Sequence, residues 1–98
     1  MKLNNPFSDD TRLLFLYVYS CFLCGRSDRG LELHHIIGRG SSSPLNACPL
    51  CIECHSHIGH SVAEQRKLLH RTAVFLEDQN YELTKEDEIF AIQWLPSN

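Results

Sequence analysis

Polar and apolar positions alternate most regularly at residues 31–35, LELHH, where two leucines take turns with Glu32 and His34. Alternation with a period of two is typical of a strand that buries one face. The segment that follows, residues 38–46, is rich in glycine and serine and predicts a loop, with a second strand expected near its end. The middle of the chain is therefore expected to contain a pair of short strands.

The segment TRLLFLYVYSCFLC, residues 11–24, is apolar almost throughout. It is long enough for a helix, whereas its tyrosines, valine and phenylalanines are favoured in strands, so periodicity does not decide between the two. In either form we expect this segment to contribute to the hydrophobic core.

Two helices are predicted in the second half of the chain, each from a capping box. In SVAE, Ser61 can accept from the backbone N–H of Glu64, and the helix should run to about Glu77. Its expected apolar stripe consists of Val62, Leu69, Ala73 and Leu76, with Leu68, Thr72 and Phe75 beside it. TKED at residues 84–87 begins the second helix, which Pro96 should end. The expected apolar face of this helix consists of Ile89, Ile92 and Leu95.

Strands in the middle and helices at the end indicate the α+β class. The chain has 98 residues, the size of one small domain. We expect a single domain over 1–98, with its core motif at 21–60 and a helical extension at 61–98. The hydrophobic core of so small a domain is marginal, and such domains often need a covalent or metal staple.

Five cysteines suggest that staple. Cys21 and Cys24 form one C-x2-C unit, and Cys51 and Cys54 form another. Paired units of this kind predict a structural Zn²⁺ held by four thiolates. Two unrelated thiol pairs, or a second unit that uses Cys48, are the alternatives; otherwise Cys48 is a small buried residue.

The net charge of −3 is unevenly distributed. Residues 1–71 carry eight Lys/Arg against six Asp/Glu, whereas residues 72–98 carry one Lys against six acidic residues. The acidic end of the chain is either a solvated helix surface or a site for a basic partner protein. The first part of the chain can still form a basic surface, from Arg26, Arg29, Arg39, Arg66, Lys67 and Arg71.

The longest apolar run, residues 13–19, is far too short to span a bilayer, so we expect no membrane association. The first residues also lack the composition of a secretory signal. Thiol pairs of the zinc-binding type fit a reducing compartment, and we expect the protein in the cytoplasm.

The order C-x2-C … LELHHI … N … LC-x2-CH … H over residues 21–60 resembles the HNH endonucleases, also called ββα-metal or His-Me finger nucleases, in their zinc-stapled form. Three features carry the resemblance. The double histidine of His34 and His35 follows an apolar strand, Asn46 precedes Cys51 by five residues, and His55 directly follows the second cysteine pair. The short HNH proteins common in bacteriophages are the most similar, which implies a host-cell cytoplasm and a phage or host protein as a possible partner.

The resemblance implies a ββα-metal finger with additional C-terminal helices, and a role for each matching residue. His34 and His55 match ligands of a catalytic divalent ion, and His35 matches the general base that activates water. Asn46 matches the residue that holds the segment bearing the base. Two neighbouring imidazoles then serve two different targets, and the strand must twist or end just after them.

A third metal ligand is less clearly marked. Many family members have a histidine four residues after the helix ligand, and here that position is Gly59. His60, one residue later, is the expected third ligand, and His57 is the alternative. Because the ligands are imidazoles, Mg²⁺, Mn²⁺, Ni²⁺ and Zn²⁺ all remain candidates.

The resemblance implies an enzyme that cleaves DNA phosphodiester bonds, as an endonuclease or nickase leaving 5′-phosphate and 3′-hydroxyl ends. Arg39, together with Arg26 and Arg29, would contact phosphates, or these charges would serve solubility alone. The alternatives are a non-catalytic zinc module that binds DNA or protein, whose histidines are ordinary strand residues, and a phage packaging or recombination factor active only within a complex.

Overall fold

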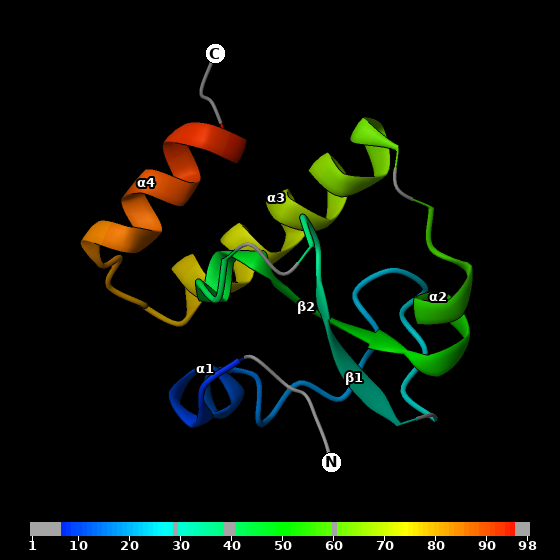
Figure 1. Ribbon diagram of the computed structural model, residues 1–98. Coiled ribbons are helices and arrows are strands. Elements are labelled where there is room, and N and C mark those ends of the chain that lie inside the picture. Colours follow the sequence, from blue (N-terminus) through cyan, green and yellow to red (C-terminus); the bar gives the residue numbers. More distant parts are fainter. Residues whose placement is uncertain (1–6, 29, 39–40, 60, 96–98) are drawn as a thin grey trace.

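The computed structural model describes residues 7–28, 30–38, 41–59 and 61–95. These residues form two strands, four α-helices and a short 3-10 helix, so the protein is of the α+β class (Figure 1). In chain order the elements are α1 (Asp9–Leu14), β1 (Leu31–His35), the 3-10 helix η1 (Pro44–Asn46), β2 (Ala47–Cys51), α2 (Ile52–His57), α3 (Val62–Asp78) and α4 (Lys85–Trp94).

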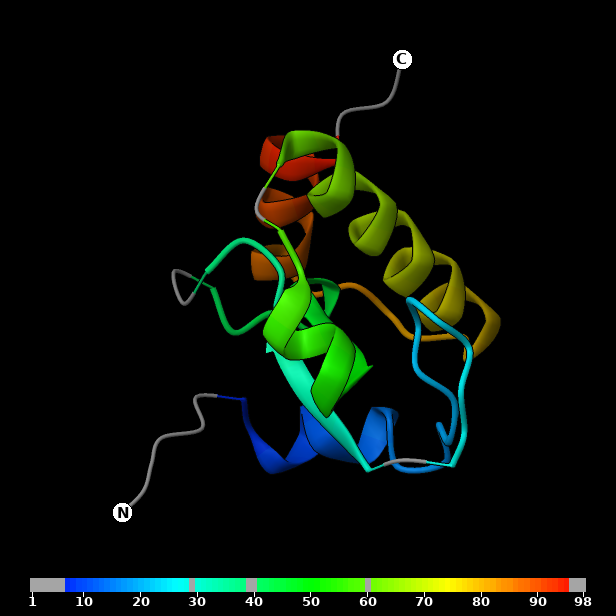
Figure 2. The same cartoon turned by 90° about the vertical axis from the view of Figure 1, so that its right-hand side faces the viewer.

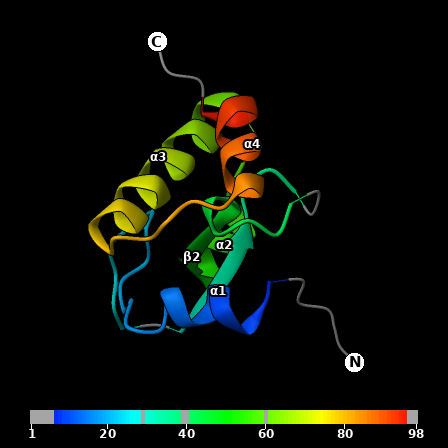
Figure 3. The same cartoon turned by 90° about the vertical axis from the view of Figure 1, so that its left-hand side faces the viewer.

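The two strands form an antiparallel pair in which Leu31 lies opposite Cys51 and His35 lies opposite Ala47. One more bond extends the ladder, because the N–H of Ile36 donates to the carbonyl of Asn46 at 2.9 Å. The strand predicted at LELHH is thus confirmed, as is a second strand at the end of the loop. α3 and α4 lie on one side of the strand pair and α1 on the opposite side (Figure 1, Figure 2 and Figure 3).

All five residues of β2 are buried, so its backbone groups need partners away from water. On the edge that does not face β1, the N–H of Phe22 donates to the carbonyl of Pro49 at 3.0 Å. The hydroxyl of Thr72, on α3, donates to the carbonyl of Ala47 at 2.7 Å. These bonds fix the first cysteine loop and α3 against the central strand.

α3 begins where the capping box predicts. Ser61 accepts from the N–H of Glu64 at 3.1 Å, and the helix ends one residue beyond the expected position. Val62 was expected in the apolar stripe, but its side chain is 64 % exposed, because the first turn of the helix faces solvent. The buried residues of α3 are Leu68, Leu69, Thr72 and Leu76.

α4 also begins at its predicted box, in which Thr84 and Asp87 cap one another. Its predicted apolar face is wrong, because Ile89 and Ile92 are 59 % and 78 % exposed whereas Phe90 and Asp87 are buried. Asp87 determines this orientation. One of its carboxylate oxygens accepts from the hydroxyl of Ser43 at 2.6 Å, and the other from Tyr81 at 2.5 Å. These two partners, of which Ser43 is distant in the chain, turn the Asp87 side of the helix inward.

The apolar segment 11–24 enters the core only in part. Its first residues belong to α1, and the residues after Leu14 form turns and irregular backbone. Phe15 and Cys21 are buried, as is the polar Thr11. Other apolar side chains of this segment are exposed, namely Leu13, Leu16, Tyr17, Tyr19 and Leu23. The expectation that the segment belongs to the core therefore holds for individual side chains, such as Phe15 and Cys21, and not for the segment as a whole.

Candidate metal centres

The sulfurs of the four predicted cysteines lie together. The Sγ atoms of Cys21, Cys24, Cys51 and Cys54 are all within 4.8 Å of one another, and those of Cys24 and Cys51 are 3.9 Å apart. A tetrahedral zinc ion with bonds of about 2.3 Å would separate its sulfurs by about 3.8 Å. The cluster therefore has the donor set and the spacing to hold a structural metal such as zinc.

Each cysteine pair is shaped by the turn that carries it. The N–H groups of Leu23 and Cys24 donate to the sulfur of Cys21, at 3.4 and 3.5 Å. The N–H of Cys54 donates to the sulfur of Cys51 at 3.5 Å, where Cys51 is also the N-cap of α2. The same local bond thus recurs in both C-x2-C turns, which explains why their spacing alone predicts the cluster.

The thiols of Cys21 and Cys54 differ in how easily they ionise. Burial alone would raise the pKa of Cys21, but hydrogen bonds from the backbone of Cys24, Cys51 and Leu23 outweigh it and lower the pKa to about 6. The pKa of Cys54 is raised by burial and by hydrogen bonds to the other thiols of the cluster. Negative charge therefore develops at Cys21 before it develops at Cys54, and a bound dication would stabilise it.

Cys48 does not belong to the cluster. It is fully buried in β2, and burial raises the pKa of its thiol to about 12. A second zinc-binding unit that uses Cys48 is therefore wrong, and Cys48 is the small core residue that the sequence suggested.

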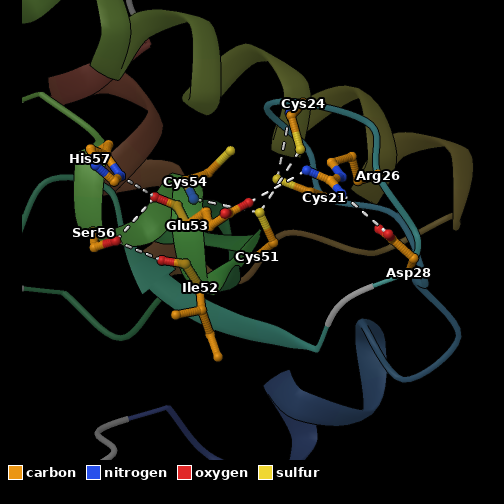
Figure 4. A network of polar contacts seen from close by, with 10 residues as sticks. All are labelled: Cys21, Cys24, Arg26, Asp28, Cys51, Ile52, Glu53, Cys54, Ser56 and His57. Atoms are coloured by element: carbon orange, nitrogen blue, oxygen red, sulfur yellow. Dashed lines mark hydrogen bonds and ion pairs between the residues drawn. The ribbon is translucent and has the colours of Figure 1, made fainter.

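An arginine connects the two cysteine turns (Figure 4). The guanidinium of Arg26 lies 3.2 Å from the carboxylate of Asp28 and 3.5 Å from that of Glu53, which lies between the cysteines of the second turn. Arg26 was a predicted DNA contact, but its charge is engaged by these two carboxylates. The other two predicted DNA contacts, Arg29 and Arg39, lie outside the described residues.

The rings of His34 and His55 meet at the junction of β1 and α2. Their centroids are 4.8 Å apart and their planes are inclined at 68°. Because Cys54 directly precedes His55, the cysteine cluster fixes the start of α2 beside the strand pair. The structure thus brings together the two histidines that the sequence assigned to one metal ion.

Glu32 is a residue of this site that the sequence analysis missed. Its carboxylate lies 2.7 Å from Nδ1 of His55. A carboxylate bonded to one imidazole nitrogen orients the ring and assigns metal binding to the other nitrogen, here Nε2. The available signal was the spacing, because Glu32 and His34 lie two residues apart and so share a face of β1.

His35 has a different environment from His34. Its ring stacks on that of Phe7, with centroids 3.9 Å apart and planes 6° from parallel, and its Nε2 atom is buried. β1 ends at His35, as the double histidine requires. Neighbouring side chains of a strand point to opposite faces, so one imidazole meets α2 and the other the N-terminal segment.

Asn46 is fully buried and bonds to the loop that follows His35. Its side-chain oxygen accepts from the N–H of Ile37 at 2.8 Å. Its side-chain nitrogen donates to the carbonyls of Gly38 and Ser41, at 2.9 and 3.0 Å. Asn46 thus holds the backbone beside His35, and its three bonds go to that backbone.

Of the two candidates for a third ligand, the structure describes only His57, which is not brought to the histidine pair. Nδ1 of His57 bonds to the carbonyl of Glu53 on its own helix, at 2.8 Å, and the residue is exposed. α2 ends at His57, before Gly59. His60 lies outside the described residues.

Comparison of the chain with protein-family models, with curated proteins and with solved structures finds no match. Among the helices in the described part of the chain, none is both long and apolar enough to cross a membrane.

Proposed function

We propose that the protein is a metal-dependent endonuclease of the HNH type, which hydrolyses DNA phosphodiester bonds to 5′-phosphate and 3′-hydroxyl ends. The observation that carries this proposal is the contact between the rings of His34 and His55, 4.8 Å apart, beside a cluster of four cysteines. A strand and the helix that follows the second strand contribute one imidazole each. This arrangement brings together two half-buried imidazoles whose ring nitrogens can act as metal ligands.

His34 and His55 would hold the catalytic divalent ion, and imidazole donors suit Mn²⁺, Ni²⁺ and Zn²⁺ as well as Mg²⁺. When bound there, the ion would neutralise a non-bridging phosphate oxygen and stabilise the departing 3′-oxygen. The carboxylate of Glu32 fixes the ring of His55 for this role.

His35 would act as the general base, since an imidazole near neutral pH can accept a proton from the attacking water. Its ring is held on one face by Phe7, and its backbone by the loop that Asn46 anchors. These contacts would restrict the imidazole to one orientation relative to the phosphate. The proton taken from the water would pass from the ring to solvent after each turnover.

A non-catalytic zinc module that binds DNA or protein is the second candidate. The observation that favours it is the burial of Nε2 of His35 beneath Phe7, because a general base must reach the water that it activates. A nuclease that is active only within a phage packaging or recombination complex would, like the non-catalytic module, fail to nick DNA when tested as the isolated protein.

Plasmid nicking tests the proposal. Zinc-loaded protein is incubated with supercoiled plasmid and Mg²⁺, Mn²⁺ or Ni²⁺, and the relaxed product is quantified. Wild type is expected to nick, and both His35→Ala and His34→Ala should lose at least a hundredfold in rate, with 5′-phosphate ends in the residual product.

His57→Ala is the matched control, because this histidine lies on α2 but bonds to its own helix. It should nick like wild type. Equal nicking by all four proteins would contradict catalysis at this site, and no nicking by zinc-loaded wild type with any of the metals would favour the non-catalytic module.

A further inference from the structure

Four residues with basic side chains lie on the solvent side of α3. Arg66, Lys67, His70 and Arg71 are all exposed, whereas the residues that alternate with them, Leu68, Leu69 and Thr72, are buried. Their spacing of one, three and four residues places them on one side of the helix. We call these four residues the α3 basic face.

The charges of the α3 basic face have no acidic partner in the described part of the chain. The ion pairs there involve Arg26 or His55 and their carboxylates, and none involves Arg66, Lys67 or Arg71. Arg26, a DNA contact expected from the sequence, is by contrast neutralised by two carboxylates. Arg66, Lys67 and Arg71 thus form a cluster of cations without a carboxylate partner there, whereas Arg12 and Lys85, which also form no ion pair, lie singly on α1 and α4.

These charges contribute little to the helix that carries them. Lys67 precedes Arg71 by four residues, so two like charges are neighbours on the helix surface and weaken it, although Glu64, three residues before Lys67, offsets part of this. The last turn, where cations would favour the helix dipole, carries Glu77 and Asp78 instead. A surface arranged against helix stability indicates a ligand of opposite charge.

The α3 basic face borders the candidate metal centres. The guanidinium of Arg71 lies 4.3 Å from the ring centroid of Phe22, in the first cysteine turn. That turn joins Cys54 through the cysteine cluster, and His55 follows Cys54 in the chain. Figure 2 shows α2, the loop around residues 21–28 and α3 on the same side of the molecule.

We propose that the α3 basic face binds the phosphate backbone of duplex DNA and so holds the substrate beside the histidine pair. The inference rests on the proposed function, since it names how the substrate of that site is held. Phosphate is the occupant that unpaired arginine and lysine side chains suit best, and such contacts carry no sequence information. Low sequence selectivity is therefore expected of the binding.

Salt-dependent duplex binding tests the inference. Zinc-loaded protein is titrated against a fluorescent 20-base-pair duplex without added Mg²⁺ or Mn²⁺, so that binding is measured apart from cleavage. R66E/K67E should bind at least tenfold more weakly than wild type. The slope of log K against log salt should also fall by about two, one for each lost phosphate contact.

The matched control is R12E/K85E, which changes the net charge equally at exposed positions of α1 and α4. It should retain binding within about threefold and keep the wild-type slope. R66Q/K67Q removes the two charges with less cost to the helix, and it should reproduce most of the loss of slope if R66E/K67E unfolds.

Equal weakening by both charge-reversed pairs, unchanged binding by R66E/K67E and R66Q/K67Q, or no duplex binding by wild type would overturn the inference. These results are separate from those of the nicking assay. Duplex binding that depends on α3 in a protein that never nicks would sink the nuclease proposal alone, whereas nicking with unaltered binding by the α3 variants would sink this inference alone.

Discussion

The cysteine cluster and the histidine pair lie side by side, but contacts of different range build them. Each cysteine turn is closed by its own backbone N–H groups, over three or four residues. His34 and His55, by contrast, are 21 residues apart in the chain and come from two different elements, β1 and α2. Their meeting depends on the register of the two strands and on the start of α2. Each turn of the first site is therefore locally determined, and only the meeting of the two turns, Cys24 with Cys51, spans 27 residues of chain. The second site depends entirely on the rest of the fold being in place.

The largest expected effect comes from breaking the cysteine cluster. Cys54→Ser should lose the bound zinc and its cooperative unfolding transition, because a structural zinc site contributes on the order of 10 kcal/mol to folding. The histidine pair should be lost with it, since Cys54 fixes the start of α2. Zinc content and thermal unfolding measure the change.

Cys48→Ala is the control for this variant, because Cys48 is a cysteine that is more deeply buried than Cys54 but lies outside the cluster. It should keep one zinc ion per chain and lose only about 1 kcal/mol of stability. Wild-type zinc content in Cys54→Ser would contradict the four-cysteine site.

The variant with the next largest expected effect distinguishes the cysteine cluster from the histidine pair. Asn46→Ala removes three hydrogen bonds of a buried side chain and should lower the free energy of unfolding by about 3 kcal/mol. Zinc content should stay at one ion per chain, because Asn46 touches the loop after His35 and not the cysteine turns. Denaturant unfolding and zinc analysis of the same preparation test this, and concurrent loss of zinc would show that the two sites are not separable.

Asp87→Asn should lower the free energy of unfolding by a smaller amount, about 2 kcal/mol. The loss would come from the contact between α4 and the loop that carries Asn46. Burial alone would raise the pKa of Asp87, but hydrogen bonds from Ser43, Tyr81 and Thr84 lower it below the usual value. A lowered folded-state pKa stabilises the protein above the unfolded-state pKa, and this stability is lost as pH falls through the folded-state pKa.

The stability difference between wild type and Asp87→Asn should therefore be constant above about pH 5 and shrink in acid. Urea unfolding at a series of pH values measures it. A difference that stays unchanged in acid would show that the carboxylate charge is not what holds α4 in place.

The sequence predictions were accurate for features that depend on neighbouring residues, and less accurate for features that depend on residues far apart in the chain. The caps at Ser61 and Thr84, and the cysteine turns, were predictable because each depends on three or four consecutive residues. The inward face of α4 was not, because Asp87 is buried by Ser43, more than forty residues away in the chain. A hydrophobic pattern cannot show that an acid has a buried partner, so it assigned the core side to isoleucines that are exposed.

The histidine pair has one contact that was predicted from the sequence and one that was not. Proximity of His34 and His55 was expected from the family resemblance, whereas the contact between Glu32 and His55 was not. The stack of Phe7 on His35 was also missed, because nothing in the spacing links a residue before α1 to the end of β1.

The smallest effect on stability is expected at Glu32, whose carboxylate is exposed and whose partner imidazole is partly exposed. Glu32→Gln should change the unfolding free energy by less than about 1 kcal/mol. It should nevertheless weaken divalent-metal binding at the histidine pair by roughly tenfold or more, because the carboxylate orients the ring of His55. Calorimetric titration with Mn²⁺ measures this, and unchanged affinity would remove Glu32 from the site.

The most direct test of the central claim, a second metal site distinct from the cysteine cluster, is a manganese titration of zinc-loaded protein followed by electron paramagnetic resonance. The account predicts one Mn²⁺ per chain in wild type and in His57→Ala, and none in His34→Ala or His55→Ala, with zinc retained in all four. Wild type that binds no Mn²⁺, or binding that survives both ligand substitutions, would contradict it.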